Sequence, residues 1–266
     1  MARSEINKKT FRIFYAILFG IFISSAYANV FLPAPQSESQ YNKLHLIVGL
    51  GIGALFSSGA DEPHTFPILN PITDELYVYS PTTSQTAYFY HGFFGAEWDW
   101  FSHWGVQAGF DYNQTSSFSA QGSFTQGADP QSTSMYTYHY DVDTKQLLLD
   151  GKLFYTLKKY FRPYILLGLG CSFNRANTYT TNVPPFLAFT RMYANNTTTS
   201  FSYAVGAGFD KDMTTHLRID IGYRFTDFGA SSLGNANIDG TSVTGTLSQS
   251  HLYANEVLTQ LIYIFN

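Results

Sequence analysis

Charged residues stand at alternate positions in stretches whose other positions are largely apolar or aromatic. In LRIDIGYRFTDFG, residues 217–229, Arg218, Asp220 and Arg224 alternate with Ile219 and Ile221. A period of two is that of a β-strand, so these charges all point to one face. The same spacing places a wider set of charges on that face: Glu97, Asp111, Asp150, Lys152, Arg218, Asp220, Arg224 and Glu256.

Charges enclosed together must be paired with opposite charges to be tolerated. If that face lines the interior of a barrel, we expect an ion-pair network across it, with Arg218 and Arg224 as its organisers. Such a network could act as a gate that opens a narrow pore when the pairs exchange. The alternative is a static plug, and the plug is the favoured interpretation.

A second set of residues has the types needed for hydrolytic catalysis at the rim of a barrel. This set comprises His139, Asp141, Asp143, Ser248, Ser250, His251 and Glu256. No local motif joins them into a nucleophile, a base and an orienting group. We therefore predict polar rim residues and a protein that is not an enzyme, with no catalytic, cofactor-binding or metal-ligating residues and no cofactor.

The alternation defines eight candidate strands, each with one apolar face. They fall near residues 44–56, 86–100, 104–113, 135–155, 164–174, 201–210, 217–229 and 256–266. In the fourth, Tyr136, Tyr138 and Tyr140 share one parity, whereas Leu147 and Leu149 share the other. A slip of one residue exchanges the two faces of a strand, so outward tyrosines and outward leucines together require a β-bulge near residue 144.

The connections between these segments alternate in length. Residues 56–85, 114–134, 176–199 and 229–249 are long and rich in Ser, Thr, Asn, Gly and Pro, whereas the links near 100–103, 157–162 and 211–215 are short. Long extracellular loops and short periplasmic turns are typical of membrane barrels. The predicted fold is all-β: an eight-stranded antiparallel transmembrane up-and-down barrel. A lipocalin-like soluble barrel is the alternative, and it would turn its apolar face inward.

The N-terminal residues predict export. A basic start is followed by a short apolar core, Ile13 to Ile23, and by the small-residue pattern Ala26-Tyr27-Ala28. We predict a cleaved signal peptide over 1–28, a short periplasmic segment over 29–42 and the barrel over 43–266. Charged residues are only 13% and aromatic residues 18% of the chain, which suits a barrel in the outer membrane of a Gram-negative cell.

Aromatic side chains are expected at both ends of the lipid-facing surface, where membrane barrels carry girdles of such residues. The predicted membrane-interface aromatics are Trp98, Trp100, Trp104, Tyr136, Tyr138, Tyr263 and Phe265. The single Cys171 excludes an internal disulfide framework. A net charge of −4 with scattered Lys and Arg gives no support to nucleic-acid binding.

At IDIGYRFTDFG, with RPYILLGLG before it and QLIYIF near its end, the sequence resembles the opacity-type and OmpA-like family of eight-stranded outer-membrane proteins. The resemblance covers about residues 43–266. It implies adhesion, surface antigenicity, membrane integrity or small pores. The terminal aromatic strand looks like the signal read by the barrel-assembly machinery, although Asn266 follows Phe265 where the usual pattern ends on the aromatic residue.

The expected role is that of a surface protein, an adhesin or surface antigen that binds host or environmental ligands through its loops. A rigid scaffold that displays polar loops is a binding architecture. The alternative is a narrow porin-like channel for ions or small solutes through the charged lumen. Expected partners are outer-membrane lipid and lipopolysaccharide, the barrel-assembly machinery and a host or surface ligand, with no nucleic acid.

Overall fold

The computed structural model describes residues 44–57, 68–69, 76–82, 85–100, 103–127, 135–157, 161–183, 192–238, 241–243 and 246–265. All of them belong to one compact unit, residues 41–266. The predicted signal peptide, residues 1–28, and the segment 29–42 lie outside the described residues. No helix in the described part of the chain is long and apolar enough to cross a membrane.

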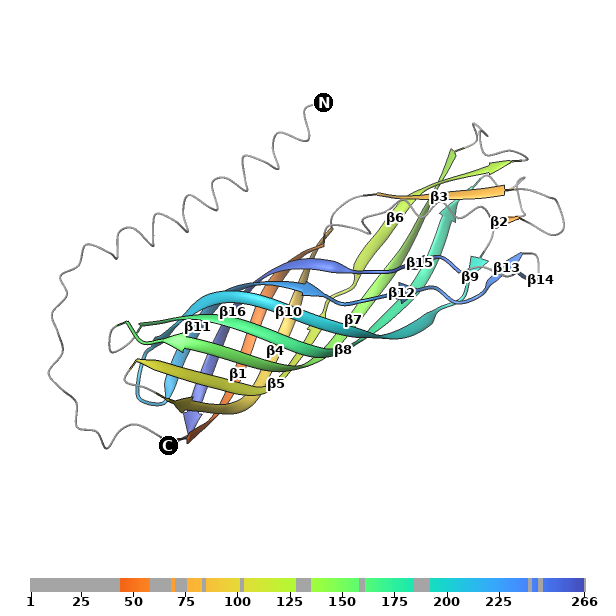
Figure 1. Cartoon of the computed structure of the whole chain (residues 1–266). Helices are drawn as coiled ribbons and strands as arrows, with labels where there is room; N and C mark the ends of the chain where they lie inside the picture. The colour runs from red at the N-terminus through yellow and green to blue at the C-terminus, as the bar shows by residue number, and fades with distance from the viewer. Residues whose placement is uncertain are drawn as a thin grey trace, which may run out of the picture. The chain divides into compact units, whose positions relative to one another are not determined.

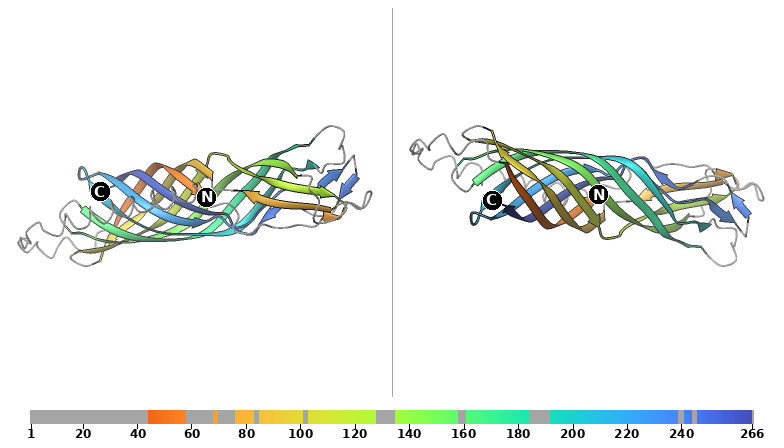
Figure 2. Two further views of the ribbon diagram at one scale, coloured as in Figure 1. Left: turned by 90° about the horizontal axis from the view of Figure 1, so that it is seen from above. Right: turned by 90° about the horizontal axis from the view of Figure 1, so that it is seen from below.

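Eight long antiparallel strands close into a barrel (Figures 1 and 2). Around the ring each strand pairs with the next, and β16 returns to β1, as when Leu50 lies opposite Leu261. The eight strands are β1 (Leu44–Ser57), β4 (Gln85–Asp99), β5 (Trp104–Thr115), β7 (Met135–Tyr155), β8 (Phe161–Asn182), β10 (Asn196–Asp212), β11 (Leu217–Asp227) and β16 (Tyr253–Phe265). The predicted all-β, eight-stranded antiparallel barrel is confirmed.

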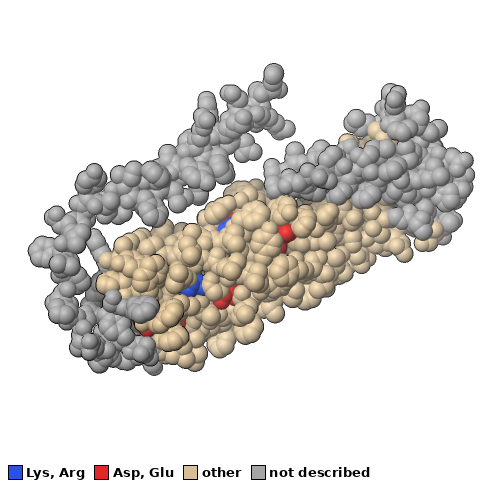
Figure 3. All heavy atoms as spheres, in the orientation of Figure 1, with Lys and Arg blue, Asp and Glu red and all other residues tan. Residues whose placement is uncertain are grey.

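The exposed face of the barrel is apolar, which decides against the lipocalin-like alternative. Leu50 is 71% exposed, Leu149 60% and Ile165 61%. On the side of the molecule shown in Figure 3, few Lys, Arg, Asp or Glu side chains reach the surface. An exposed apolar band around a polar interior is what lipid outside and a filled lumen inside require.

The strands continue beyond this apolar band at the end of the barrel that carries the long connections. There β6 (Phe118–Gly127) pairs with the upper part of β7, β3 (Leu76–Thr82) pairs with β6, and β2 (Ile68–Leu69) pairs with β3. We call this part the head: these strands, residues 135–143 of β7, residues 175–182 of β8, and the described residues 192–200 and 228–252. It also includes five short strands: β9 (Met192–Tyr193), β12 (Ser231–Ser232), β13 (Ala236–Ile238), β14 (Thr241–Val243) and β15 (Ser248–Gln249).

The head corrects the expectation that the long connections are loops. Their Tyr, Phe and Thr residues favour extended chain, and segments from different connections pair with one another. Figure 1 shows β3, β6 and the upper parts of β7 and β8 running past the barrel as a continuous sheet. The described parts of the long connections therefore contain much β-structure.

Strand β7 keeps one inward parity along its length, and this corrects the bulge predicted near Thr144. Tyr138, Tyr140, Thr144, Asp150 and Phe154 are all buried, so even-numbered residues point inward in both halves. The irregularity lies in the partner strand. Between the pairs His139↔Thr180 and Asp141↔Asn177, β7 advances by two residues and β8 by three.

The extra residue of β8 lies at Thr178, whose φ of 57° is in the left-handed region. One residue in that conformation is a recognised form of β-bulge, and it is unusual for a β-branched side chain. The backbone N–H of Thr178 donates to Asn195 Oδ1 at 3.2 Å, and its hydroxyl donates to Asn177 Oδ1 at 2.8 Å. These contacts hold the bulge in place.

Candidate functional site

The lumen contains the charges that the alternation places inside, and they form three connected clusters. Nearest the short turns, Arg218 is 1% exposed and donates to Glu97, with Nη2 3.0 Å from Oε1. Its Nε donates to Asp212 Oδ1 at 2.6 Å. Arg162 bridges the same two carboxylates, at 2.6 Å from Glu97 and 3.2 Å from Asp212. Two guanidinium groups thus neutralise two carboxylates.

The middle cluster centres on Lys152, which projects from β7. Its ammonium group pairs with Asp220, lies 3.4 Å from Asp210 Oδ1, and stands 3.9 Å from the centre of the Tyr164 ring. The Tyr164 hydroxyl donates to Asp220 Oδ1 at 2.8 Å. Arg218 Nη1 lies 3.9 Å from Asp210 Oδ2 and joins this cluster to the one below.

The upper cluster surrounds Arg224. Its Nε donates to Glu256, and its Nη1 donates to Asp111 Oδ2 at 3.0 Å. Asp111 also lies 3.2 Å from His91 Nδ1 and accepts from Asn113 Nδ2 at 2.6 Å. Every residue of the predicted network is buried in the lumen, and all but Asp150 are in an ion pair.

A polar cavity of about 30 Å³ lies between the middle and upper clusters. Several polar atoms on its lining residues lack a hydrogen-bond partner among the described residues: both Asp150 carboxylate oxygens, Gln107 Oε1, Arg224 Nη2 and Gln260 Nε2. A cavity of this volume has room for a few water molecules and for nothing much larger. The described side chains therefore fill the lumen almost completely.

Glycines allow these side chains to pack. A Cβ built on Gly168 would lie 2.0 Å from Asp150 Oδ1, and one on Gly49 would lie 1.8 Å from Gln260 Nε2. Glycine is thus needed where a lumen side chain crosses the face of a neighbouring strand. The glycines at alternate positions make room for the charged side chains, as the crowded interior of an eight-stranded barrel requires.

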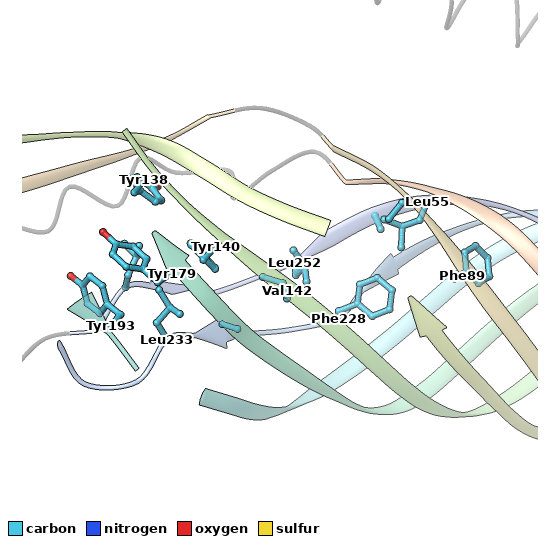
Figure 4. Packing of buried hydrophobic residues seen from close by; sticks show 14 of the residues in the cluster. Leu55, Phe89, Tyr138, Tyr140, Val142, Tyr179, Tyr193, Phe228, Leu233 and Leu252 are labelled. Atoms are coloured by element: carbon cyan, nitrogen blue, oxygen red, sulfur yellow. The ribbon is translucent and has the colours of Figure 1, made fainter. Parts of the chain in front are cut away.

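Above the charged clusters the interior becomes apolar (Figure 4). We call this group the upper apolar cluster. Its members are Leu55, Ala87, Phe89, Phe124, Tyr138, Tyr140, Val142, Ala176, Tyr179, Tyr193, Phe228, Leu233, Ala236, Leu247, Leu252, Ala254 and Leu258. Phe89 meets the upper charged cluster, because the Arg224 guanidinium stands 5.5 Å from the centre of its ring.

The chain after β11 folds inward and supplies much of this apolar cluster. Phe228, Leu233 and Leu252 are buried, and β12 pairs with β15. Polar side chains from neighbouring strands bind its backbone: Asn174 Nδ2 donates to the carbonyls of Phe228 and Ala230, each at 2.8 Å. The described residues of 228–252 thus form the inward-folded part of the head, and we call them the inner segment.

Two predicted interface aromatics, Tyr136 and Tyr138, face the interior instead of lipid. Tyr138 is buried in the upper apolar cluster, and Tyr136 packs against that cluster with its ring 5.7 Å from Phe124. At these two positions β7 lies beyond the apolar band. Water surrounds the strand there, so its apolar side chains turn inward. Burial also raises the pKa of Tyr138 to about 12, with a smaller contribution from the nearby Tyr193.

The other predicted interface aromatics lie on the outer surface near the short-turn end. Trp98, Trp100 and Trp104 are about half exposed, as are Tyr263 and Phe265. Trp104 meets the edge of Tyr155 with ring centres 4.9 Å apart, and Tyr263 meets Phe265 in the same way at 4.9 Å. Tyr164 lies in the lumen, where it contacts Lys152 and Asp220.

The rim residues considered for hydrolysis are dispersed. His139 Nε2 lies 3.5 Å from Asp141, and His251 Nδ1 lies 2.8 Å from Asp227. Asp143 instead accepts from Ser117 and Asn177. Ser248 lies in the β12–β15 pair, and Glu256 is bound to Arg224 inside the lumen. The structure thus places these groups at separate positions.

Sequence reasoning missed four members of the charged clusters: Arg162, Asp210, Asp212 and His91. The alternation places Asp210 and His91 on the inward faces of their strands, so it could have identified both residues as members of the charged clusters. Arg162 lies next to the short turn before β8, yet its parity matches that of the buried Tyr164. Asp212 has the same parity as Asp210 and lies directly opposite Arg218 across the short turn between β10 and β11, so the hairpin register pairs the two residues.

The sequence matches the family model described as the outer membrane protein beta-barrel domain over residues 16–249. The chain belongs to this family of outer-membrane β-barrel proteins. Its apolar band therefore faces the lipid of the outer membrane, and the opening stretch LRIDIGYRFTDFG is a membrane strand with its charges in the lumen. The resemblance to an outer-membrane barrel family is confirmed, as is the predicted location.

Solved structures similar to this chain match it at low sequence identity and with TM-scores below 0.5. Neisserial surface protein A is 12% identical, with a TM-score of 0.40, and the match covers 84% of this chain and 99% of that one. OprG from Pseudomonas aeruginosa is 13% identical, with a TM-score of 0.45, and the match covers 85% of this chain and 98% of that one. Ail, the attachment invasion locus protein of Yersinia pestis, is 15% identical, with a TM-score of 0.37, and the match covers 82% of this chain and 98% of that one. Among curated proteins, no sequence matches the chain.

Proposed function

We propose that this outer-membrane barrel is a non-catalytic interaction protein of the cell surface, in the manner of an adhesin or surface antigen. The observation that carries this proposal is the filled interior. A cavity of about 30 Å³ lies between the middle and upper charged clusters and has room only for a few water molecules. The lower and middle charged clusters lie below this cavity, and the upper charged cluster and the upper apolar cluster lie above it.

The construction of the head supports the same role. Long loops facing outward are the rule for outer-membrane barrels, so the head projects from the cell. An apolar core of buried residues fixes its strands, and a rigid platform loses little conformational entropy when it binds a partner. The small size of the cavity between the charged clusters also supports a role other than a solute channel, because a channel requires a connected path.

Single-channel recording in a planar bilayer tests this proposal. The chain is refolded in detergent, its folding is checked by heat-modifiable gel mobility, and it is compared with Arg224→Ala and with the surface variant Lys145→Ala. Lys145 lies exposed on β7, so its removal leaves the charged clusters intact. We expect no discrete openings from the wild-type protein or from Lys145→Ala.

The alternative role is a narrow channel, and the same recording separates the two. Discrete wild-type openings that change in Arg224→Ala and persist in Lys145→Ala would make the lumen a conduction path and would overturn the proposal. Openings in Arg224→Ala alone are consistent with it, because that substitution removes a side chain that fills the lumen. In that case the side chains of the wild-type protein would keep its lumen closed.

A further inference from the structure

The head carries a groove that the filled lumen does not explain. It has a volume of about 420 Å³ and crosses three neighbouring strands, β6, β7 and β8. The strands align so that Ser123 lies opposite Thr137, and Thr137 opposite Asn182. The residues that line the groove are Gln121, Gly122, Ser123, Thr137, Tyr138, His139, Thr180, Thr181 and Asn182.

The described part of the lining is polar. Its side chains include two carboxamides, from Gln121 and Asn182, and hydroxyl groups from serine and threonine residues. The described lining includes no Lys, Arg, Asp or Glu. His139 is its one imidazole, and its Nε2 lies 3.5 Å from Asp141 Oδ1. Carboxamides and hydroxyls both donate and accept hydrogen bonds, and they suit a ligand rich in hydroxyl groups.

The sheet that carries the groove is fixed from its inner face. Tyr138, between the groove residues Thr137 and His139, turns its ring inward into the upper apolar cluster, where it stacks on Tyr140 and Tyr179 at 6.3 and 6.4 Å. The β-bulge at Thr178 lies next to the groove and sets the direction of the residues that follow it, Thr180 among them. Bulges occur at sites where a side chain has to be re-aimed. The Thr180 hydroxyl donates to the His139 carbonyl at 3.4 Å and ties the two strands there.

We propose that this groove binds an uncharged saccharide, a short neutral glycan segment of two or three sugar units. The inference rests on the proposed function, since a saccharide at the tip of the head would be the partner of a surface interaction protein. The volume lies within the range of small-ligand sites. The uncharged lining selects against sulfated or sialylated chains, because those need cationic partners to offset the loss of water from their anions.

The test is binding of the refolded full chain, in detergent micelles, to an array of neutral, sulfated and sialylated oligosaccharides. The best neutral binder is then titrated against four variants. Thr137→Val removes one hydroxyl from the groove, and Thr137→Trp fills it. Thr197→Val and Thr197→Trp are matched controls, because Thr197 is an exposed threonine of the head on β10 and does not line the groove.

We expect binding to neutral oligosaccharides that is about fivefold weaker in Thr137→Val, the effect of one lost hydrogen bond. Binding should be lost in Thr137→Trp and unchanged in both Thr197 variants. Thr137 is exposed, so its variants should fold, and heat-modifiable mobility checks that they do. Absence of neutral binding, preference for anionic chains, or equal binding by Thr137→Trp would each overturn the proposal.

Failure of this proposal is distinct from failure of the proposed function. A protein that is silent in the bilayer but binds no neutral saccharide would lack this site and could still be a surface interaction protein. Wild-type openings in the bilayer would instead remove the proposed function itself, whatever the array shows.

Discussion

The lower barrel and the head are built from the same strands with opposite polarity. Along β7, Asp150 and Lys152 point inward and Leu147 and Leu149 point outward in the barrel. In the head the same inward parity carries Tyr140 and other apolar residues. The outer solvent explains the inversion: lipid surrounds the barrel and water surrounds the head. The membrane boundary therefore lies where the apolar residues move from the outward face of β7 to its inward face, while the strand keeps its register.

The barrel and the head also fill their interiors in different ways. The lumen is held by ion pairs, which are expensive to bury and strongly coupled, whereas the head is held by apolar contacts. Substitutions in the two regions should accordingly fail in different ways, and the following predictions run from the largest expected effect to the smallest.

The largest effect should come from Arg218→Ala in the lower charged cluster. Removing this guanidinium leaves Glu97 and Asp212 with Arg162 alone and should lower the free energy of unfolding by about 3–5 kcal/mol. Urea unfolding in lipid vesicles, followed by tryptophan fluorescence, measures it. Lys211→Ala, an exposed cation on β10, is the control and should change the value by less than about 0.5 kcal/mol. A loss under 1 kcal/mol in Arg218→Ala would mean that the lumen tolerates unpaired carboxylates.

Leu233→Ala tests the head. Leu233 is fully buried in the upper apolar cluster, so the cavity left by truncation should cost about 2–5 kcal/mol. The loss should be local: protease cleavage within the head should accelerate while the barrel keeps its heat-modifiable mobility. Equal destabilisation of barrel and head would show that the two regions unfold as one unit.

Leu149→Arg and Thr137→Arg compare the two outer surfaces on one strand and one parity. Leu149 is 60% exposed to lipid, and arginine there should cost about 2–4 kcal/mol. Thr137 is exposed in the head, where arginine meets water and should change stability by less than about 0.5 kcal/mol. Vesicle unfolding of both variants gives the difference. An equal loss of stability in the two variants would mean that the membrane boundary lies elsewhere on β7.

The smallest effect concerns alkaline pH and Tyr138. Its pKa is raised to about 12, whereas the unfolded chain releases this proton near the ordinary value of 10.0. Between these values the unfolded state holds fewer protons, so the free energy of unfolding falls as pH rises from about 10 to 12. Tyr138→Phe should cost at most about 1 kcal/mol at neutral pH and should lessen the alkaline loss.

Protease cleavage of the head between pH 8 and 12 measures this effect. Phe124→Leu, another substitution in the upper apolar cluster, should weaken the head without changing the shape of the pH profile. If Tyr138→Phe shows the wild-type profile, the alkaline loss arises at other tyrosines.

Much of the barrel could be predicted from sequence because a membrane strand has one strict rule. Leu46, Leu50 and Ile52 alternate with small or polar residues, and lipid outside fixes which face is which. The number of strands, the closed ring and the inward set of charges follow from that rule and from the lengths of the connections. Alternation alone thus predicts that Arg224 lies in the lumen.

The rest depends on information that alternation does not contain. Glu97 and Arg218 are 121 residues apart, and their contact depends on how the strands are staggered around the ring. Tyr136 and Tyr138 were turned outward because apolar residues were assumed to face lipid throughout. That rule ends at the membrane boundary, where the inward face becomes the apolar one. The bulge was placed in β7 for the same reason, whereas it lies in β8 at Thr178.

A single-cysteine scan of β7 tests the polarity inversion most directly. In a Cys171→Ser background, residues 136–153 are replaced singly by cysteine and labelled with a fluorophore in vesicles that contain brominated lipid. The account predicts lipid quenching at 147, 149 and 153, labelling by a water-soluble maleimide at 137, 139 and 141, and neither at the buried even positions of either half. Lipid quenching at 136, 138 and 140 would contradict it and would restore the outward tyrosines and the bulge in β7.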